Sequence, residues 1–269
     1  MQIRPLIYGV DFDYASGTWL AKENVSTYRK NLIAIVKDAW RQYKAIPCFS
    51  WHLSNPYAPT GYDNRMGCRY RFCKDLPSYP EEHRYVIHEI LTNTGDSCGL
   101  GNLSGKNNAT GYRNPRQWFE ARCQEVADII NQLTDGNGKA IPFIFRLWHE
   151  WEDNWMWWGP NSVSANDYRR FFILTEELIK KKAPKAEILW GYCPDRHWNN
   201  EKKLMARYLG DEYVDIIGFD DYSIGKSEKA LAATIKRARI VSDVAKQHGK
   251  VSALFETANK NNNIRSSYV

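Results

Sequence analysis

Six short apolar runs recur along the chain, and helical patterns separate them. The runs are Leu6–Phe12, Ala45–Trp51, Ile141–Leu147, Glu187–Cys193, Val214–Phe219 and Val251–Phe255. Each has the length of a buried strand, and a strand that returns after a helix runs parallel to its predecessor. The alternation therefore predicts an α/β fold with a parallel sheet, either closed into a barrel or open and doubly wound.

Four of the intervening segments carry helical signals. They are Leu32–Tyr43, Asn114–Leu133, Ser164–Ile179 and about Lys229–His248. Their apolar residues recur at helical spacing, and the second begins with Asn-Pro, which places proline at the first helical position. Ser164 resembles the start of a capping box, and Gly249 follows the last segment as a C-cap glycine would. The long segment His52–Asn114 is expected to be a loop.

The position of the polar residues favours a barrel over the open sheet. His52, Arg146 with Glu150, Asp220 to Tyr222, and Glu256 each follow an apolar run. Polar, potentially reactive side chains at the carboxyl ends of many strands are typical of a (β/α)8 barrel. An open nucleotide-binding sheet would carry a glycine-rich turn after its first strand, and Tyr8–Phe12 leads into none.

The strand count falls short of a closed barrel. Six runs are visible where eight are needed, and the expected loop leaves too little chain for two more βα units. We therefore expect residues 1–269 to form a single catalytic barrel domain that is incomplete, with the first and last strands missing and the chain truncated at both ends.

Composition excludes several classes of function. The net charge of +6 comes from 37 basic and 31 acidic residues, too evenly mixed for a nucleic-acid footprint. No apolar run approaches membrane-spanning length, and no signal peptide opens the chain. The six cysteines lack zinc-ligand spacing, and no cofactor or metal is expected. Cys48, Cys123 and Cys193 are expected to be buried thiols, and one disulfide among the loop cysteines is left open.

Glu150 and Glu256 are the candidate catalytic pair. Glycoside hydrolysis needs one carboxylic acid to protonate the leaving oxygen and a second carboxylate across the anomeric carbon. His149 and Arg146 could set the pKa and orientation of Glu150, and Tyr222 could hydrogen-bond Glu256 and keep it ionised. The plainer alternative for each glutamate is a structural salt bridge with a neighbouring arginine. Asp220 or Asp221 is expected to cap the following turn.

A cluster of tryptophans surrounds Glu150 in sequence. Trp151, Trp155, Trp157 and Trp158 fall within the segment that ends at Gly159. Several buried indoles would leave N–H donors to satisfy, whereas a cleft that stacks sugar rings uses indoles naturally. The pattern predicts a carbohydrate site, with some of these rings lining the cleft and others lying under it. His52, next to Trp51, is a further candidate, although a single histidine is often structural.

These residues together resemble the family 26 glycoside hydrolases, which are retaining enzymes built on (β/α)8 barrels. The resemblance rests on five segments: Tyr8–Phe12, Phe49–His52 with Asn55-Pro56, Arg146–Gly159, Asp215–Tyr222 and Glu256-Thr257. It implies that Glu150 is the acid/base and Glu256 the nucleophile, and that His52, Arg146, His149, Trp155, Trp158 and Tyr222 contact or support the substrate.

The resemblance also implies a polysaccharide substrate. Cleavage of β-1,4-mannans, including glucomannan and galactomannan, is the first expectation, with mixed-linkage β-glucan or β-1,3-xylan as alternatives. The full-length protein would be secreted, periplasmic or at the cell surface, and monomeric. The chain departs from the family pattern at Trp151–Asn154, at Met156 and at Ala258. A non-catalytic polysaccharide-binding remnant and a partner-dependent fragment are the rival interpretations.

Overall fold

The computed structural model describes residues 6–12, 22–53, 55–57, 85–98, 111–152 and 156–257. Within these ranges it has the six expected strands. They are β1 (Ile7–Asp11), β2 (Ile46–Ser50), β3 (Phe143–Arg146), β4 (Ile188–Tyr192), β5 (Ile216–Asp221) and β6 (Val251–Thr257). The predicted strands are confirmed, with one shift at their ends. β5 and β6 each run two residues further than expected, so Asp220 and Glu256 lie on strands rather than after them.

Six helices connect the strands in the described ranges. They are α1 (Lys22–Tyr43), α2 (Val86–Thr92), α3 (Pro115–Ile130), α4 (Ala165–Lys182), α5 (Glu201–Leu204) and α6 (Glu228–Gln247). The four predicted helices are confirmed. The expectation that all of residues 52–114 is loop is wrong, because α2 lies within it and buries Val86, Ile87 and Ile90. A helix of seven residues is too short to show a clear period in the sequence.

The helix starts agree with their sequence signals. The Asn114 side chain accepts a hydrogen bond from the backbone N–H of Gln117, with Pro115 in the first turn. Ser164 accepts from the N–H of Asp167 in the same way. These contacts satisfy backbone donors that have no partner inside the helix. At the other end of α6, Gly249 has φ +65°, a left-handed conformation that glycine adopts without strain.

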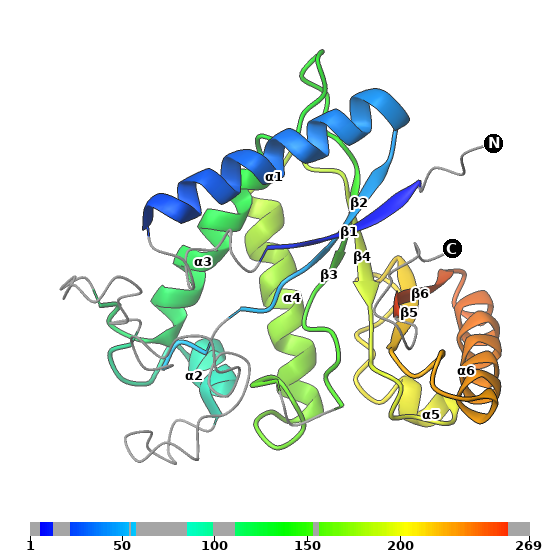
Figure 1. Cartoon of the computed structure of the whole chain (residues 1–269). Coiled ribbons are helices and arrows are strands. Elements are labelled where there is room, and N and C mark those ends of the chain that lie inside the picture. The colour runs from blue at the N-terminus through cyan, green and yellow to red at the C-terminus, as the bar shows by residue number, and fades with distance from the viewer. Residues whose placement is uncertain are drawn as a thin grey trace.

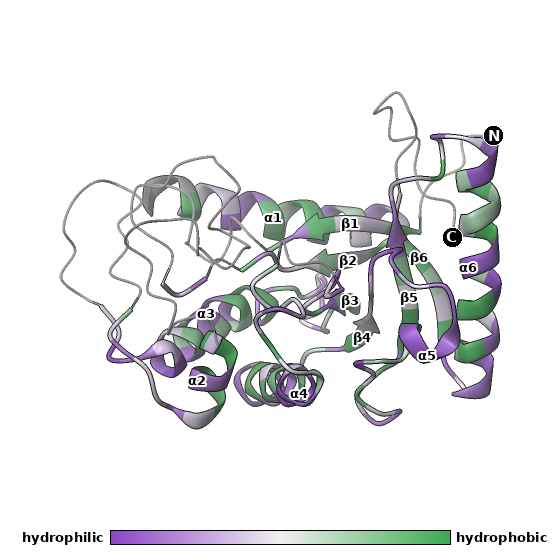
Figure 2. Ribbon diagram, turned by 90° about the horizontal axis from the view of Figure 1, so that it is seen from below, coloured by the Kyte–Doolittle hydropathy of each residue, from purple (hydrophilic) through white to green (hydrophobic). Residues whose placement is uncertain are grey.

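All six strands are parallel and lie side by side in chain order, β1 to β6. A doubly wound sheet would reverse its order at a switch point, and this sheet does not. Figure 2 shows the strands following a curved arc with the helices outside it. In Figure 1, α1, α3 and α4 flank the first four strands, and α6 lies beside β5 and β6.

The described part of the fold is a (β/α)8 barrel left open. Among the described residues, no strand pairs with the outer edge of β1 or of β6. Val251 on β6 and Leu6 next to β1 are strongly exposed, at 62% and 70%. Both apolar side chains lie at the edges where a closed barrel would place neighbouring strands. No helix in the described ranges is both long and apolar enough to cross a bilayer.

The core lies mainly between the strands and the helices. Phe143 and Phe145 of β3 are buried there, with Phe119 of α3 and Phe171 of α4. Successive side chains of a strand point to opposite faces, so Ile144 enters a smaller cluster with Cys48 and Ile216 on the inner side of the arc. Arg146 follows Ile144 by two positions and shares that inner face. The described cysteines, Cys48, Cys98, Cys123 and Cys193, are free and buried; Cys68 and Cys73 lie outside the described residues.

Candidate active site

The strand register gathers polar side chains at the carboxyl end of the sheet. Asp11 of β1 is level with Ser50 of β2, and Ser50 is level with Arg146 of β3. On the far side of the arc, Asp220 of β5 is paired with Glu256 of β6. Parallel strands end at the same edge, so residues far apart in sequence meet here.

Arg146 links the two sides of this edge. Its Nη1 donates hydrogen bonds to both carboxylate oxygens of Asp220, at 3.1 and 3.0 Å, and its Nη2 donates to Oε1 of Glu256. A side chain at Gly191 would meet Arg146, because an added Cβ would lie 3.1 Å from its Cγ. The guanidinium is buried, and the two carboxylates hold its pKa well above the ordinary value despite that burial.

Glu256 is held in its ionised form. Besides the contact with Arg146, its Oε2 accepts a hydrogen bond from the Tyr222 hydroxyl, as the sequence predicted. Burial by itself raises the pKa of Glu256, but Arg146 and then the Tyr222 hydroxyl outweigh it and leave the pKa well below the usual value. The Glu256 side chain keeps 24% of its surface exposed, and Tyr222 keeps 39%, so a ligand could reach both.

Glu150 has the opposite electrostatic environment. Burial, followed by the negative charges of Asp220, Glu256 and Asp195, raises its pKa to about 9. Arg146 opposes the shift but is the smallest of these influences, because its guanidinium hydrogen-bonds Asp220 and Glu256 instead. The expectation that Arg146 sets the pKa of Glu150 is therefore corrected: burial dominates. Glu150 carries a proton at neutral pH, whereas Glu256 does not.

The two aspartates at the end of β5 have different roles. Burial and Glu256 raise the pKa of Asp220 against the effect of Arg146. Asp221 faces away and accepts from the backbone N–H of Ser223 at 2.8 Å, which is the turn-capping contact expected for one of the pair. Metal-ligating atoms of His149, Asp220 and Glu256 lie within 4.8 Å of one another. The Arg146 guanidinium already supplies positive charge between the two carboxylates.

The loop that presents Glu150 has an unusual backbone. Trp148 and Glu150 have φ of +49° and +53°, in the left-handed region that costs non-glycine residues about 1–2 kcal/mol each. Hydrogen bonds hold this shape: the Glu150 N–H donates to the Cys193 carbonyl at 2.8 Å, and the Tyr168 hydroxyl donates to the Trp148 carbonyl at 2.8 Å. Two strained residues thus flank His149 in the loop that carries the candidate acid Glu150.

The tryptophans support this loop from below rather than lining a cleft. Trp157 and Trp158 are fully buried, and Trp151 is 5% exposed. Trp158 donates its indole N–H to the His149 carbonyl at 2.8 Å, and Trp157 donates to the Leu53 carbonyl at 2.7 Å. The expectation that Trp158 contacts substrate is corrected, because it has no accessible surface. Backbone carbonyls thus satisfy the N–H donors of Trp157 and Trp158, whereas the Trp151 N–H has no partner in the described part of the molecule. Trp155 lies outside the described residues.

His52 and His149 form a pair beside the carboxylates. Their Nε2 atoms lie 3.1 Å apart, and Nδ1 of His52 lies 2.6 Å from Oδ2 of Asp11. Burial, then His52 and Arg146, lower the pKa of His149 well below its ordinary value, so this ring is neutral. Sequence reasoning missed Asp11 as a member of the site. Asp11 lies at the end of the first strand, and this position could have indicated it as a candidate site residue.

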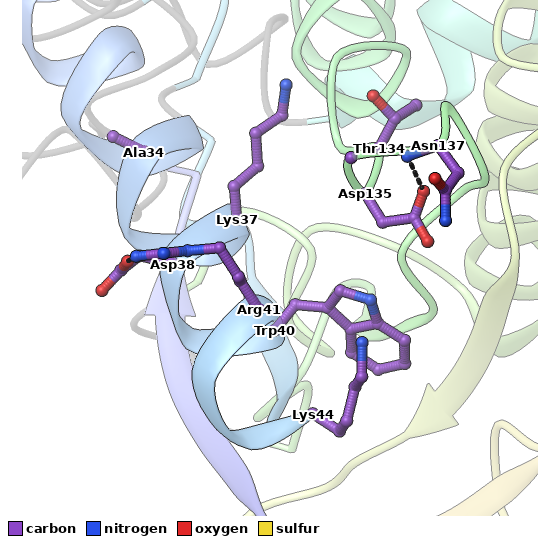
Figure 3. Close-up of a pocket in the computed structure, with 10 residues that line it drawn as sticks. Ala34, Lys37, Asp38, Trp40, Arg41, Lys44, Thr134, Asp135 and Asn137 are labelled. Carbon is purple, nitrogen blue, oxygen red and sulfur yellow. Dashed lines mark hydrogen bonds and ion pairs between the residues drawn. The ribbon is translucent and has the colours of Figure 1, made fainter.

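A separate cleft lies away from these residues. It has a volume of about 500 Å³ and lies between the end of α1 and the turn that precedes β3, near the amino ends of the strands. Figure 3 shows Lys37 and Trp40 of α1 and Lys44 just after it, on one side of the cleft, with Thr134, Asp135 and Asn137 of the turn on the other. The Lys44 ammonium lies 4.9 Å from the centre of the Trp40 ring. None of the strand-end carboxylates lines this cleft.

Two carboxyl groups at strand ends of a barrel, one kept protonated and one ionised, form the arrangement with which glycoside hydrolases work. The comparisons with known proteins agree with that class. The family model for glycosyl hydrolase family 26 matches residues 112–265, which is more than half of the chain. The chain belongs to this family.

Curated relatives extend the match. A mannan endo-1,4-β-mannosidase from Bifidobacterium adolescentis is 30% identical over 143 residues, covering 51% of this chain and 14% of the relative. Another from Bacillus subtilis is 26% identical over 226 residues, covering 81% of this chain and 50% of the relative. The chain thus spans half or less of the length of these two proteins.

Solved structures show the same fold. A GH26C structure from Muricauda sp. aligns with a TM-score of 0.75 at 21% identity, covering 98% of this chain and 64% of that one. A GH26 β-mannanase from Bacteroides ovatus aligns with a TM-score of 0.68 at 21% identity, covering 95% and 63%. At this identity the likeness concerns the fold.

Proposed function

We propose that this chain carries the catalytic centre of a retaining, endo-acting β-1,4-mannanase, with Glu150 as acid/base and Glu256 as nucleophile. The observation that carries the proposal is the opposite protonation of the two glutamates, one protonated and buried, the other ionised between Arg146 and Tyr222. The mannanase names of the curated relatives support the choice of substrate.

In the first step, the Glu256 carboxylate attacks the anomeric carbon while Glu150 gives its proton to the departing sugar oxygen. The C–O bond to the leaving sugar breaks, and a glycosyl ester forms on Glu256. In the second step, Glu150 takes a proton from water, and the water oxygen displaces the Glu256 carboxylate with a second inversion, so that the configuration is retained overall. The mechanism expects the two carboxyl groups to be about 5–5.5 Å apart.

The surrounding residues have supporting roles in this scheme. Arg146 and Tyr222 donate hydrogen bonds that keep the nucleophile ionised. We propose that His52 borders the sugar next to the cleaved bond, that the fully buried His149 supports it from behind, and that Trp155 supplies the stacking surface that the buried tryptophans do not. Mannan, glucomannan or galactomannan is the proposed substrate, and mixed-linkage β-glucan or β-1,3-xylan is the alternative. Secretion or a periplasmic or surface site, and a monomeric state, complete the proposal for the full-length protein.

The test is reducing-sugar release from glucomannan, galactomannan, barley β-glucan and β-1,3-xylan, with Glu256→Ala as the inactive control. Release from the mannans alone, lost in the variant, is the expected result. Sugar release from the glucan or the xylan instead would identify that polymer, and not mannan, as the substrate. Binding of mannohexaose in calorimetry with no product from any polymer would support a binding protein and overturn the catalytic proposal.

The stereochemistry can be tested on the same material. Proton NMR during the first turnovers should show the β-anomer of the new reducing end before mutarotation. First appearance of the α-anomer would show inversion and exclude Glu256 as a nucleophile that forms a glycosyl ester.

A further inference from the structure

A chain of hydrogen-bonding side chains runs from the edge of the sheet to the catalytic glutamates. Oδ2 of Asp11 lies 2.6 Å from Nδ1 of His52 and also accepts from the Ser50 hydroxyl at 3.1 Å. His52 in turn faces His149, with 3.1 Å between the two Nε2 atoms. A ring nitrogen of His149 lies within 4.8 Å of carboxylate oxygens of Asp220 and Glu256.

We propose that Asp11 is a positioning residue that determines, through His52, which ring nitrogen of His149 carries the proton. A carboxylate can only accept, so Asp11 selects the form of His52 with hydrogen on Nδ1. In the neutral form of His52, the ring then has a lone pair on Nε2. The facing Nε2 of neutral His149 must carry the hydrogen that joins the two rings.

An unpaired atom supports this assignment of protons. Nδ1 of His149 is buried and has no hydrogen-bond partner in the described part of the molecule. With hydrogen on Nε2, this nitrogen is a bare acceptor. If His52 instead donated from Nε2, His149 would carry its hydrogen on Nδ1, as a buried N–H donor without an acceptor. Buried unpaired N–H groups are rarer than unsatisfied acceptors, so the arrangement selected by Asp11 is favoured.

The consequence for catalysis rests on the proposed function. The neutral His149 ring lies beside the Glu256 carboxylate, and His149 belongs to the loop that presents Glu150. Moving its hydrogen from Nε2 to Nδ1 would reverse the ring dipole next to the nucleophile. Substrate binding would change little. The second step, in which the Glu256 carboxylate is released from the ester and regains its negative charge, would slow.

Asp11→Asn is the decisive variant, because the amide keeps the shape of the side chain but can donate to Nδ1 of His52. Its control is Tyr28→Phe, which removes a hydrogen bond of 3.1 Å to the backbone carbonyl of Asp11 and leaves the carboxylate untouched. In ¹⁵N-histidine-labelled protein, two-bond proton–nitrogen correlations identify the protonated nitrogen of each ring. A His52→Gln variant assigns the signals.

The wild type and the Tyr28→Phe control should show hydrogen on Nδ1 of His52 and on Nε2 of His149. Asp11→Asn should move both hydrogens and lower kcat about 10- to 100-fold with KM nearly unchanged, the range for partners that orient a functional histidine. In a His52→Gln background, Asp11→Asn should lower kcat no further.

Three outcomes would overturn the inference: unchanged tautomers in Asp11→Asn, an equal loss of kcat in Tyr28→Phe, or a full additional loss in the His52→Gln background. If the wild type releases no sugar, the proposed function fails, but the NMR experiment still decides the inference. Should Asp11→Asn fail to fold, Ser50→Ala, which removes the other donor to Oδ2, must leave both tautomers unchanged.

Discussion

Replacing Arg146 by methionine should destabilise the protein in a manner that depends on pH. The guanidinium is buried and is the cation that Asp220 and Glu256 share. Methionine fills a similar volume but leaves two carboxylates facing each other without a partner. Breaking a buried ion pair from one side typically costs about 3–5 kcal/mol.

The pH dependence follows from the protons that the carboxylates then bind. Without Arg146, burial and like charge raise the folded-state pKa of Glu256 above its unfolded value of about 4.3. Keeping that carboxyl protonated costs about 1.36 × (7 − 4.3), or about 3.7 kcal/mol, at pH 7 and about 1 kcal/mol at pH 5. In the wild type the folded-state pKa of Glu256 is depressed, so its stabilisation is present above the unfolded pKa and is lost as pH falls. The difference in free energy of unfolding between the wild type and Arg146→Met should therefore become smaller toward low pH.

Urea unfolding at pH 7 and pH 5 measures this difference. The control is Arg41→Met, which removes an exposed pair with Asp38 and should change the free energy of unfolding very little at either pH. A loss that is the same at pH 5 as at pH 7 would show that Arg146 acts through packing instead of charge. A loss no larger than that of the control would refute the bridging role altogether.

Three further predictions concern the site and the strands next to it. Glu150→Gln should lower kcat on mannan about 10²- to 10⁴-fold, but much less on an aryl mannoside whose leaving group needs no acid. In the wild type, activity should fall as pH rises through about 9, where Glu150 loses its proton. A similar loss on both substrates would contradict the acid role. Tyr222→Phe removes a donor that favours ionised Glu256, so the acidic limb of the kcat/KM profile should move to higher pH; an unmoved limb would show that the contact has no such effect. Gly218→Ala would place a methyl group 2.5 Å from the Phe255 ring and 2.7 Å from the Ala253 carbonyl oxygen. It should lower the free energy of unfolding in urea by about 1–3 kcal/mol. The control Gly9→Ala, whose added methyl group has nothing within 4 Å, should lower it clearly less.

Local signals predicted the framework well. The helix starts at Asn114 and Ser164 followed from single residues whose side chains cap backbone donors, and the structure confirms both. The six strands followed from short apolar runs. The helix α2 was missed, since seven residues give barely two turns of periodicity. Local chemistry is enough for these features because the atoms that form them are neighbours in sequence.

The tryptophans show where local reasoning fails. Sequence alone offers two uses for an indole near a carboxylate, as a sugar platform or as a buried support, and the platform was the wrong choice for Trp158. What decides is whether an acceptor for the N–H lies nearby in space. That acceptor is the His149 carbonyl, which lies in the left-handed turn between Trp148 and Glu150 and within hydrogen-bonding distance of the indole N–H.

The sequence by itself determined the alternation of strands and helices and the caps, and it indicated Glu150 and Glu256 as the candidate pair. Apolar periodicity and position relative to a strand end can be recognised from consecutive residues. Only the tertiary structure decided the partners: that Arg146 joins Asp220 to Glu256 rather than pairing with Glu150, and that Asp11 reaches His149 through His52. These contacts depend on the register between strands separated by up to 110 positions in the chain. Register is set by the packing of the whole sheet against its helices, and no short stretch of sequence contains it.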